Sequence, residues 1–204
     1  VTGAASKLAF DVQPTNTTAG ESISPAITVR ILDNHNNLVA NATDEVTLAI
    51  LANPGSGTLS GTQTVAAVNG VATFNDLSIN KTGSGYTLQA TATGLAADTS
   101  DPFNITPAAA TKLAFGVQPA NTVAGVSITP AVTVRILDAF DNLVTSATDN
   151  ISLDIENDAS VLGDAVLNGT TTVAASGGIA TFSNLNIQKS GTGYTLMATA
   201  ASLD

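Results

Sequence analysis

The sequence contains no cysteine and no tryptophan, and charged residues of either sign are scarce. Without cysteine the chain forms neither disulfides nor thiolate metal sites, and cysteine catalysis is excluded. Charged residues make up 11% of the 204 residues, against about 25% in an average soluble domain. No apolar run approaches the roughly 20 residues that a membrane helix needs, so we expect no membrane insertion.

Positive charge is especially scarce. Six Lys and Arg residues stand against sixteen Asp and Glu, which gives a net charge of -10. Such a chain repels phosphate, so nucleic acid is excluded as a partner, whereas divalent cations are attracted. The hydrophobic fraction of 44% is high enough for a packed core.

The two halves of the sequence repeat each other. The matching segments are residues 7–14 (KLAFDVQP) with 112–119 (KLAFGVQP), residues 27–39 with 132–144, and residues 70–95 with 178–203. The first two pairs are offset by 105 residues and the last by 108, so the second copy carries a three-residue insertion between Asp149 and Gly178. Self-similarity on this scale predicts two tandem domains, residues 1–107 and 108–204.

Each copy consists of short segments in which apolar and polar residues alternate, as in half-buried β-strands. In the first copy these segments are residues 8–12, 27–31, 46–50, 62–66, 71–79, 86–92 and 103–105. No stretch has helical periodicity. About seven short strands per 100 residues predict an all-β fold of two immunoglobulin-like Greek-key sandwiches. The apolar parity switches between Phe74 and Leu77, which predicts a β-bulge or a bend at Asn75-Asp76.

A tyrosine follows a glycine-rich turn at the start of residues 86–92. A tyrosine in this place, Tyr86 in the first copy and Tyr194 in the second, is typical of the tyrosine corner of Greek-key sandwiches. The alternative is that each is simply a core aromatic residue. Both interpretations assign these two side chains a structural role.

Several sequence segments resemble the bacterial immunoglobulin-like tandem repeats of large surface proteins and adhesins. These repeats are distantly similar to the stalk domains of invasin and intimin. The segments are KLAFDVQP, ITVRILDNHNNLV, GVATFNDLSINKTGSGYTLQATATGL and PFNIT. The family usually has glycine in the turn after the second strand, whereas this chain has residues 33–37 (DNHNN) and 138–142 (DAFDN). We expect Asn or Asp to take the left-handed position instead. The resemblance implies an extracellular cell-surface stalk whose partners are neighbouring repeats or copies of itself.

The second copy reaches Asp204, which aligns with Ala96, and has no counterpart of residues 103–106. We therefore expect the second sandwich to lack its last strand and to have an open sheet edge. Two explanations stay open at this point. The chain is a piece of a longer array, or another chain donates the strand and the protein is a self-assembling filament subunit.

Candidate catalytic groups are few. His35 is the sole histidine and lies in a polar turn, and its counterpart is Phe140. Carboxylates follow or precede strands at Asp33, Asp138, Asp44 and Asp149. Side chains in such places more often cap turns than catalyse hydrolysis. The sequence predicts no enzyme and no cofactor, with an accessory module of a polysaccharide enzyme as a further alternative.

Calcium is the one metal that the loops suggest, because it prefers carboxylate and amide oxygens. Asp138, Asp141 and Asn142 form one candidate set. Asp98 and Asp101 form another. Neither set matches the D-x-D-x-D-G loop of calcium-binding motifs, so turn capping is the competing interpretation.

Overall fold

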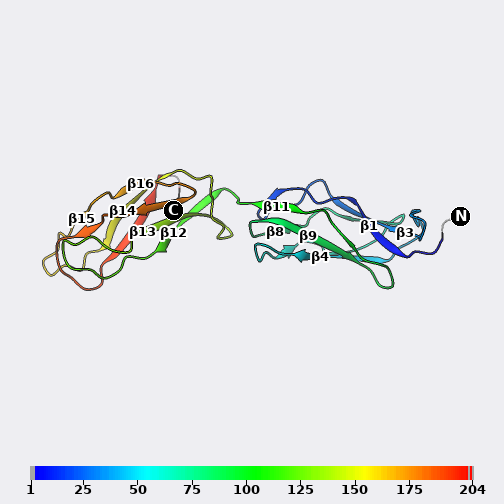
Figure 1. Cartoon of the computed structure of the whole chain (residues 1–204), viewed down its shortest axis with the longest axis horizontal. Coiled ribbons are helices and arrows are strands. Elements are labelled where there is room, and N and C mark those ends of the chain that lie inside the picture. The colour runs from blue at the N-terminus through cyan, green and yellow to red at the C-terminus, as the bar shows by residue number, and fades with distance from the viewer. Residues whose placement is uncertain (1–2, 202, 204) are drawn as a thin grey trace. The chain divides into compact units, whose positions relative to one another are not determined.

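The computed structural model describes residues 3–201 and 203, and these contain strands, turns and loops without any helix. The chain divides into two compact units, unit 1 (Val1–Pro107) and unit 2 (Ala108–Asp204), which are seen in Figure 1. Each unit has its own cluster of buried apolar side chains. The protein is therefore all-β with two separate cores.

Unit 1 contains eleven strands among its described residues. They are β1 (Lys7–Val12), β2 (Thr17–Thr18), β3 (Ile27–Leu32), β4 (Glu45–Ala52), β5 (Leu59–Ser60), β6 (Thr64–Ala66), β7 (Val71–Phe74), β8 (Ser78–Ile79), β9 (Gly83–Thr91), β10 (Asp98–Thr99) and β11 (Phe103–Thr106). One sheet has the order β1-β3-β7 and the other the order β2-β11-β9-β4-β6, with β10 also on β9 and a small β5-β8 pair apart. The seven strands of three or more residues overlap the seven predicted segments, although β7 covers only the first part of residues 71–79, and the other strands are two-residue pairings.

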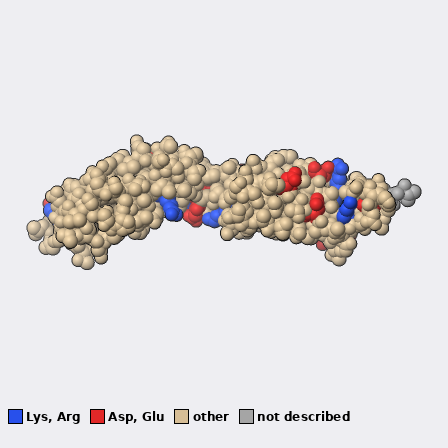
Figure 2. Space-filling model, viewed as in Figure 1, with Lys and Arg blue, Asp and Glu red and all other residues tan. Residues whose placement is uncertain are grey.

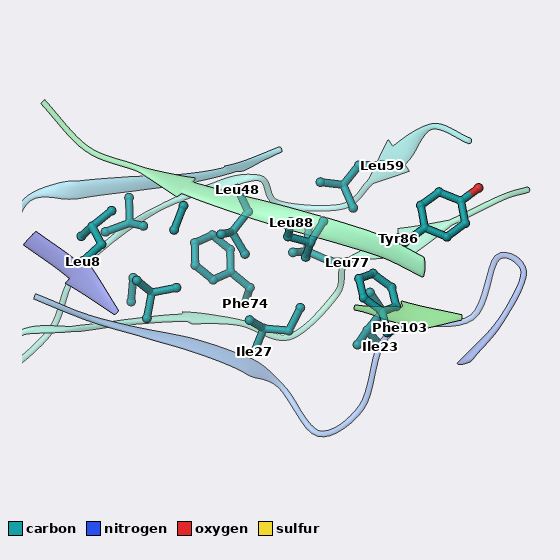
Figure 3. Close-up of a cluster of buried hydrophobic side chains, with 14 of the residues drawn as sticks. Leu8, Ile23, Ile27, Leu48, Leu59, Phe74, Leu77, Tyr86, Leu88 and Phe103 are labelled. Atoms are coloured by element: carbon teal, nitrogen blue, oxygen red, sulfur yellow. The ribbon is translucent and has the colours of Figure 1, made fainter. Parts of the chain in front are cut away.

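The core of unit 1 follows from alternation along the central strands. In β3 the side chains of Ile27, Val29 and Ile31 are completely buried, whereas Arg30 faces solvent. Opposite them lie Leu48 and other apolar side chains of the second sheet (Figure 3). Full burial of one such side chain stabilises the fold by about 1.5–3 kcal/mol. The core therefore fills the space between the two sheets.

Residues 71–79 differ from the prediction of one bulged strand. They form two strands, of which β7 pairs with β3 and β8 pairs with β5. The chain changes sheets at Asn75-Asp76, where Asp76 Oδ1 accepts the backbone N–H of Thr62 (2.9 Å). Phe74, at the end of β7, and Leu77, just before β8, are both buried, because the bend between them turns both side chains toward the core. The parity switch marks a bend at Asp76 where the chain changes sheets, so the bend is confirmed and no bulge is present in the pairings of β7 or β8.

Unit 2 contains eight strands among its described residues. They are β12 (Ala110–Val117), β13 (Val132–Asp138), β14 (Asn150–Asn157), β15 (Leu167–Asn168), β16 (Thr172–Ala174), β17 (Ile179–Phe182), β18 (Asn186–Ile187) and β19 (Thr195–Ala200). Its sheets have the orders β12-β13-β17, β16-β14-β19 and β15-β18. The three-residue insertion lies in the loop 158–166, which replaces the shorter loop 53–58 of unit 1.

One edge differs between the units. In unit 1, β9 begins at Gly83 and pairs with β11 over its first residues. In unit 2, β19 begins only at Thr195 and pairs with β14 alone among the described residues. The described part of unit 2 therefore supplies no strand in the place that β11 takes in unit 1.

Candidate functional site

The most distinctive arrangement in unit 1 joins the beginning of the unit to its end. Strand β2 pairs with β11 in parallel, with Thr17 opposite Ile105 and Thr18 opposite Thr106. The pairing continues where the N–H of Ala19 donates to the carbonyl of Thr106 (2.8 Å). An early segment and the last strand of the unit are thus direct neighbours running the same way.

Two polar side chains before β2 extend this contact. Asn16 Oδ1 accepts the N–H of Asn104 (2.7 Å). Gln13 Oε1 accepts the N–H of Asp101 (2.9 Å). Side-chain acceptors therefore continue the backbone ladder where the segment is not a regular strand.

Strand β1 makes a second parallel contact with the late part of the unit. The N–H of Leu8 donates to the carbonyl of Ala96, and the N–H of Ala96 donates to the carbonyl of Ser6 (both 2.9 Å). Further along, Asp98 Oδ2 accepts the N–H of Phe10 (2.8 Å). We call the paired segments 6–19 and 96–106 the terminal clamp.

The turn after β3 is organised by a buried carboxylate, as turn capping predicts. Asp33 is 1% exposed. Its Oδ1 accepts the N–H groups of His35 and Asn37 (both 2.9 Å), and its Oδ2 accepts the N–H of Gly3 (2.8 Å). The hydrogen bond from the Asn37 side chain, followed by that from the Gly3 N–H, holds the pKa of Asp33 well below its ordinary value. Asn36 takes the left-handed position with φ 65°, which confirms that prediction.

Unit 2 repeats this turn. Asp138 Oδ1 accepts the N–H groups of Phe140 (2.8 Å) and Asn142 (2.9 Å), and Oδ2 accepts the N–H of Ala108 (2.9 Å). Burial raises the pKa of Asp138, but the hydrogen bonds from Asn142, Ala108 and Phe140 together outweigh it and the net shift is downward. Asp141 takes the left-handed position with φ 63°. In each unit the carboxylate thus fixes the incoming chain to the end of a core strand.

The tyrosines lie at the same place in both units. The hydroxyl of Tyr86 donates to the carbonyl of Lys81 (2.9 Å), and that of Tyr194 to the carbonyl of Lys189 (3.1 Å). Tyr86 is completely buried, and burial raises the pKa of its phenol. A Cβ on Gly57 would lie 2.9 Å from the Tyr86 hydroxyl oxygen, so the loop passes closely over the ring.

Removal of the buried hydroxyl gives a first testable prediction. Tyr86→Phe is expected to lower the free energy of unfolding of unit 1 by about 1–2 kcal/mol, since the carbonyl of Lys81 loses a donor in a closed site. Urea denaturation measures this. Tyr194→Phe in the more open unit 2 is the matched control and should cost less. Equal losses of unfolding free energy in the two variants would contradict the idea that burial strengthens the contribution of the Tyr86 hydroxyl.

The residues weighed for catalysis lie apart from any cluster. The His35 side chain is exposed, as is Asp44, whereas Asp149 is half-buried. Among residues 3–201 and 203, no group of three or more His, Asp or Glu side chains is arranged to hold a metal ion.

The structure brings together only part of the calcium candidates. Asp138 and Asn142 are in contact, but the Asn142 amide donates to Asp138 Oδ2 (2.9 Å). Asp141 Oδ1 accepts instead from the Lys112 ammonium (2.6 Å). Asp98 is engaged by the N–H of Phe10, and the backbone N–H of Asp101 by Gln13. The carboxylates of Asp138 and Asp98 thus accept N–H groups in turn and clamp hydrogen bonds, whereas Asp101 joins the clamp through its backbone N–H.

Sequence reasoning missed Gln13 and Asn16, the two acceptors of the terminal clamp. Both recur in the second copy, as Gln118 and Asn121. Their segment lacks apolar alternation, so nothing in it suggested a strand. The recurrence of polar residues in an irregular segment was the signal that could have identified them.

Charged side chains are sparse on the face seen in Figure 2. The ion pair Arg30–Asp11 (2.7 Å) and the pair Lys112–Asp141 lie on the surface. Exposed pairs of this kind contribute about 0–1 kcal/mol. The residues described include no helix long and apolar enough to cross a membrane.

Comparisons with known proteins give remote similarities only. No family model matches the chain, and no curated protein matches it. Among solved structures, the chain is similar to the Parabacteroides merdae β-glucuronidase (12% identity, TM-score 0.33), covering 99% of this chain and 24% of that one. It is also similar to the Escherichia coli adhesin FdeC (17% identity, TM-score 0.44), covering 98% of this chain and 62% of that one. A chimeric titin Z1Z2 tandem matches at 12% identity and a TM-score of 0.25, over 97% of this chain and 99% of that one.

The chain thus spans about a quarter of the glucuronidase and less than two thirds of the adhesin. The substrates or ligands of those two proteins are therefore not assigned to this chain. The contacts within each unit are therefore the basis for the function proposed below.

Proposed function

We propose that the chain is a stretch of a structural or adhesive stalk at an extracellular cell surface, built from immunoglobulin-like sandwiches at residues 1–107 and 108–204. The terminal clamp is the observation that carries this proposal. A stalk must transmit tension from one repeat to the next, and tension enters and leaves each repeat through its two ends. Those ends are the segments that the clamp joins in unit 1.

The clamp opposes tension because its two segments run in parallel. When the ends of unit 1 are pulled apart, segments 6–19 and 96–106 slide past each other along their length. Backbone hydrogen bonds between strands lie across the strands, so they are loaded together rather than broken one at a time. The pairs of Thr17 with Ile105 and Thr18 with Thr106 share this load with the N–H of Ala19.

The same proposal includes a non-catalytic role without a cofactor. It is supported by the engagement of the candidate carboxylates in turns and by the exposure of His35. The proposed partners are neighbouring repeats of the same kind, and the proposed location rests on the resemblance of the repeated phrases to surface-protein repeats. The proposal names no particular adhesive ligand.

The filament alternative requires one copy to donate a strand to another. The β11 strand has the apolar alternation that covers this edge in unit 1, yet its Phe103 and Ile105 are only 2% and 3% exposed there. Donation would open that core, which disfavours this alternative. Analytical sedimentation at increasing protein concentration tests the filament alternative. A monomer throughout the concentration range would contradict it.

Single-molecule pulling through the two chain ends tests the stalk proposal. We expect two unfolding events, with unit 1 yielding at a higher force than unit 2. The double variant Gln13→Ala with Asn16→Ala should lower the force of unit 1, because two acceptors of the clamp are lost. Asn34→Ala, at an exposed turn position, is the matched control and should leave both forces unchanged. A unit 1 that unfolds at low force regardless of variant would contradict a role of the terminal clamp in resisting tension.

A further inference from the structure

The segment that connects the two units in sequence is tied to unit 2 by a carboxylate. Residues 107–109, the connector, join β11 to β12. Pro107 has no N–H to donate, whereas the N–H of Ala108 donates to Asp138 Oδ2 (2.9 Å). Asp138 ends β13 and is completely buried. The first residue of unit 2 is thus held by a side chain 30 positions further along the chain.

The two carboxylate oxygens of Asp138 have different kinds of partner. Oδ1 accepts the backbone N–H groups of Phe140 and Asn142, which belong to the turn itself. Oδ2 accepts the N–H of Ala108 and the side-chain amide of Asn142 (both 2.9 Å). A backbone N–H can only donate, but a side-chain amide can rotate and present its oxygen instead. Oδ2 is therefore the oxygen that takes up a proton with the smaller loss, since the rotated amide accepts the new O–H.

A proton on Oδ2 breaks the tie to the connector. The charge on the carboxylate disappears, and the hydroxyl oxygen is a much weaker acceptor for the N–H of Ala108 than the carboxylate oxygen was. The two hydrogen bonds to Oδ1 still hold the turn in its shape. The turn and the connector thus respond differently to the same proton.

Unit 1 has the same division of partners. Asp33 Oδ1 accepts the backbone N–H groups of His35 and Asn37. Asp33 Oδ2 accepts the N–H of Gly3 (2.8 Å) and the side-chain amide of Asn37 (3.0 Å). The arrangement therefore recurs in both copies, although the turn sequences differ at three of five positions, DNHNN against DAFDN.

We propose that Asp138 is an acid-released latch on the connector: uptake of a proton from water at Oδ2 frees the N–H of Ala108 while the turn 138–142 keeps its structure. The latch is closed at neutral pH, where the carboxylate is ionised. It opens before unit 2 unfolds, because only one hydrogen bond to the connector has to break. The latch does not depend on the stalk role proposed above.

The charged groups around the latch are engaged elsewhere. Asp141 of the turn pairs with Lys112 of β12 (2.6 Å), and Arg135 of β13 faces solvent. The connector itself is uncharged. Burial raises the pKa of Asp138, but its hydrogen bonds lower it by more than burial raises it. The latch therefore opens only as the pH falls below the ordinary value of 3.8.

Amide hydrogen exchange in the intact chain, between about pH 5 and about pH 2, tests the latch. Each rate is divided into the rate of an unfolded peptide at the same pH, which gives a protection factor. The protection of Ala108 should fall by about tenfold or more, because a hydrogen bond to a charged acceptor is lost. The amides of Ile136, bonded to the carbonyl of Gly178 (2.8 Å), and of Phe140 should keep their protection. The carbon-13 shift of the Asp138 carboxyl should titrate with the same midpoint as the loss at Ala108.

Asp138→Asn removes the charge and keeps the size of the side chain. Ala108 should then be poorly protected at every pH, whereas Gly3 in unit 1 keeps its acid-dependent protection as the internal control. In the unmodified chain, constant protection of Ala108, an equal loss at Ile136 or Phe140, or a different midpoint for the Asp138 carboxyl would each overturn the proposal. These results decide the matter even where the variant does not fold. Acid-dependent protection of Ala108 in a folded Asp138→Asn chain would overturn it as well.

Discussion

Phe103→Ala is expected to lower the free energy of unfolding of unit 1 by about 3–5 kcal/mol. The phenyl ring is 2% exposed and lies against Tyr86, so its removal loses buried apolar area and leaves a cavity. Folded domains are stable by only about 5–15 kcal/mol. The variant should therefore bring unit 1 close to unfolding at ambient temperature while unit 2 keeps its own transition.

Urea denaturation with probes for each unit measures this effect. Leu51→Ala in the same unit is the matched control, because Leu51 is 53% exposed, and it should change the stability by less than about 0.5 kcal/mol. A loss below about 1 kcal/mol for Phe103→Ala would contradict the role of β11 as part of the core. So would an equal loss for both variants.

The second large effect is expected at the buried turn of unit 2. Asp138→Ala should destabilise unit 2 by about 3 kcal/mol, since the N–H groups of Ala108, Phe140 and Asn142 lose a charged acceptor. Thr145→Ala, at an exposed position after the turn, is the control and should have little effect. A loss as small as that of the control would contradict the account of the turn.

The same carboxylates give a dependence on pH with a definite sign. The pKa values of Asp33 and Asp138 are both lower in the folded chain than the ordinary value of 3.8. The unfolded chain therefore binds protons more readily, so stability is fully present above about pH 4 and falls as the pH drops further. Asp138→Asn should weaken this acid sensitivity in unit 2 and leave it in unit 1. Thermal melts between pH 2 and pH 6 measure both, and an unchanged pH profile of unit 2 would contradict this assignment.

Much of the secondary structure could be predicted because it depends on neighbours in sequence. Alternation identifies β3 and β9, whose inward side chains are buried. The left-handed positions of Asn36 and Asp141 could be predicted because few residue types tolerate that conformation. Both features depend on residues that are close in sequence, so the sequence of a single chain is enough to recognise them.

The pairing of distant segments could not be predicted. Whether residues 71–79 form one strand or two depends on which sheets their ends join, and alternation carries no such information. The terminal clamp joins residues about ninety positions apart through Asn16 and Gln13, which no apolar pattern marks. The hydrogen bonds that engage Asp138 could not be predicted for a similar reason, since most of their N–H donors belong to the backbone and leave no trace in composition.

Amide hydrogen exchange at Ala19 and Ala124, measured together in the intact chain, tests the terminal clamp most directly. The account predicts strong protection at Ala19, whose N–H is bonded to Thr106, and exchange near the unfolded rate at Ala124. Rapid exchange at Ala19 under native conditions would mean that the ends of unit 1 are not held together and would contradict the clamp.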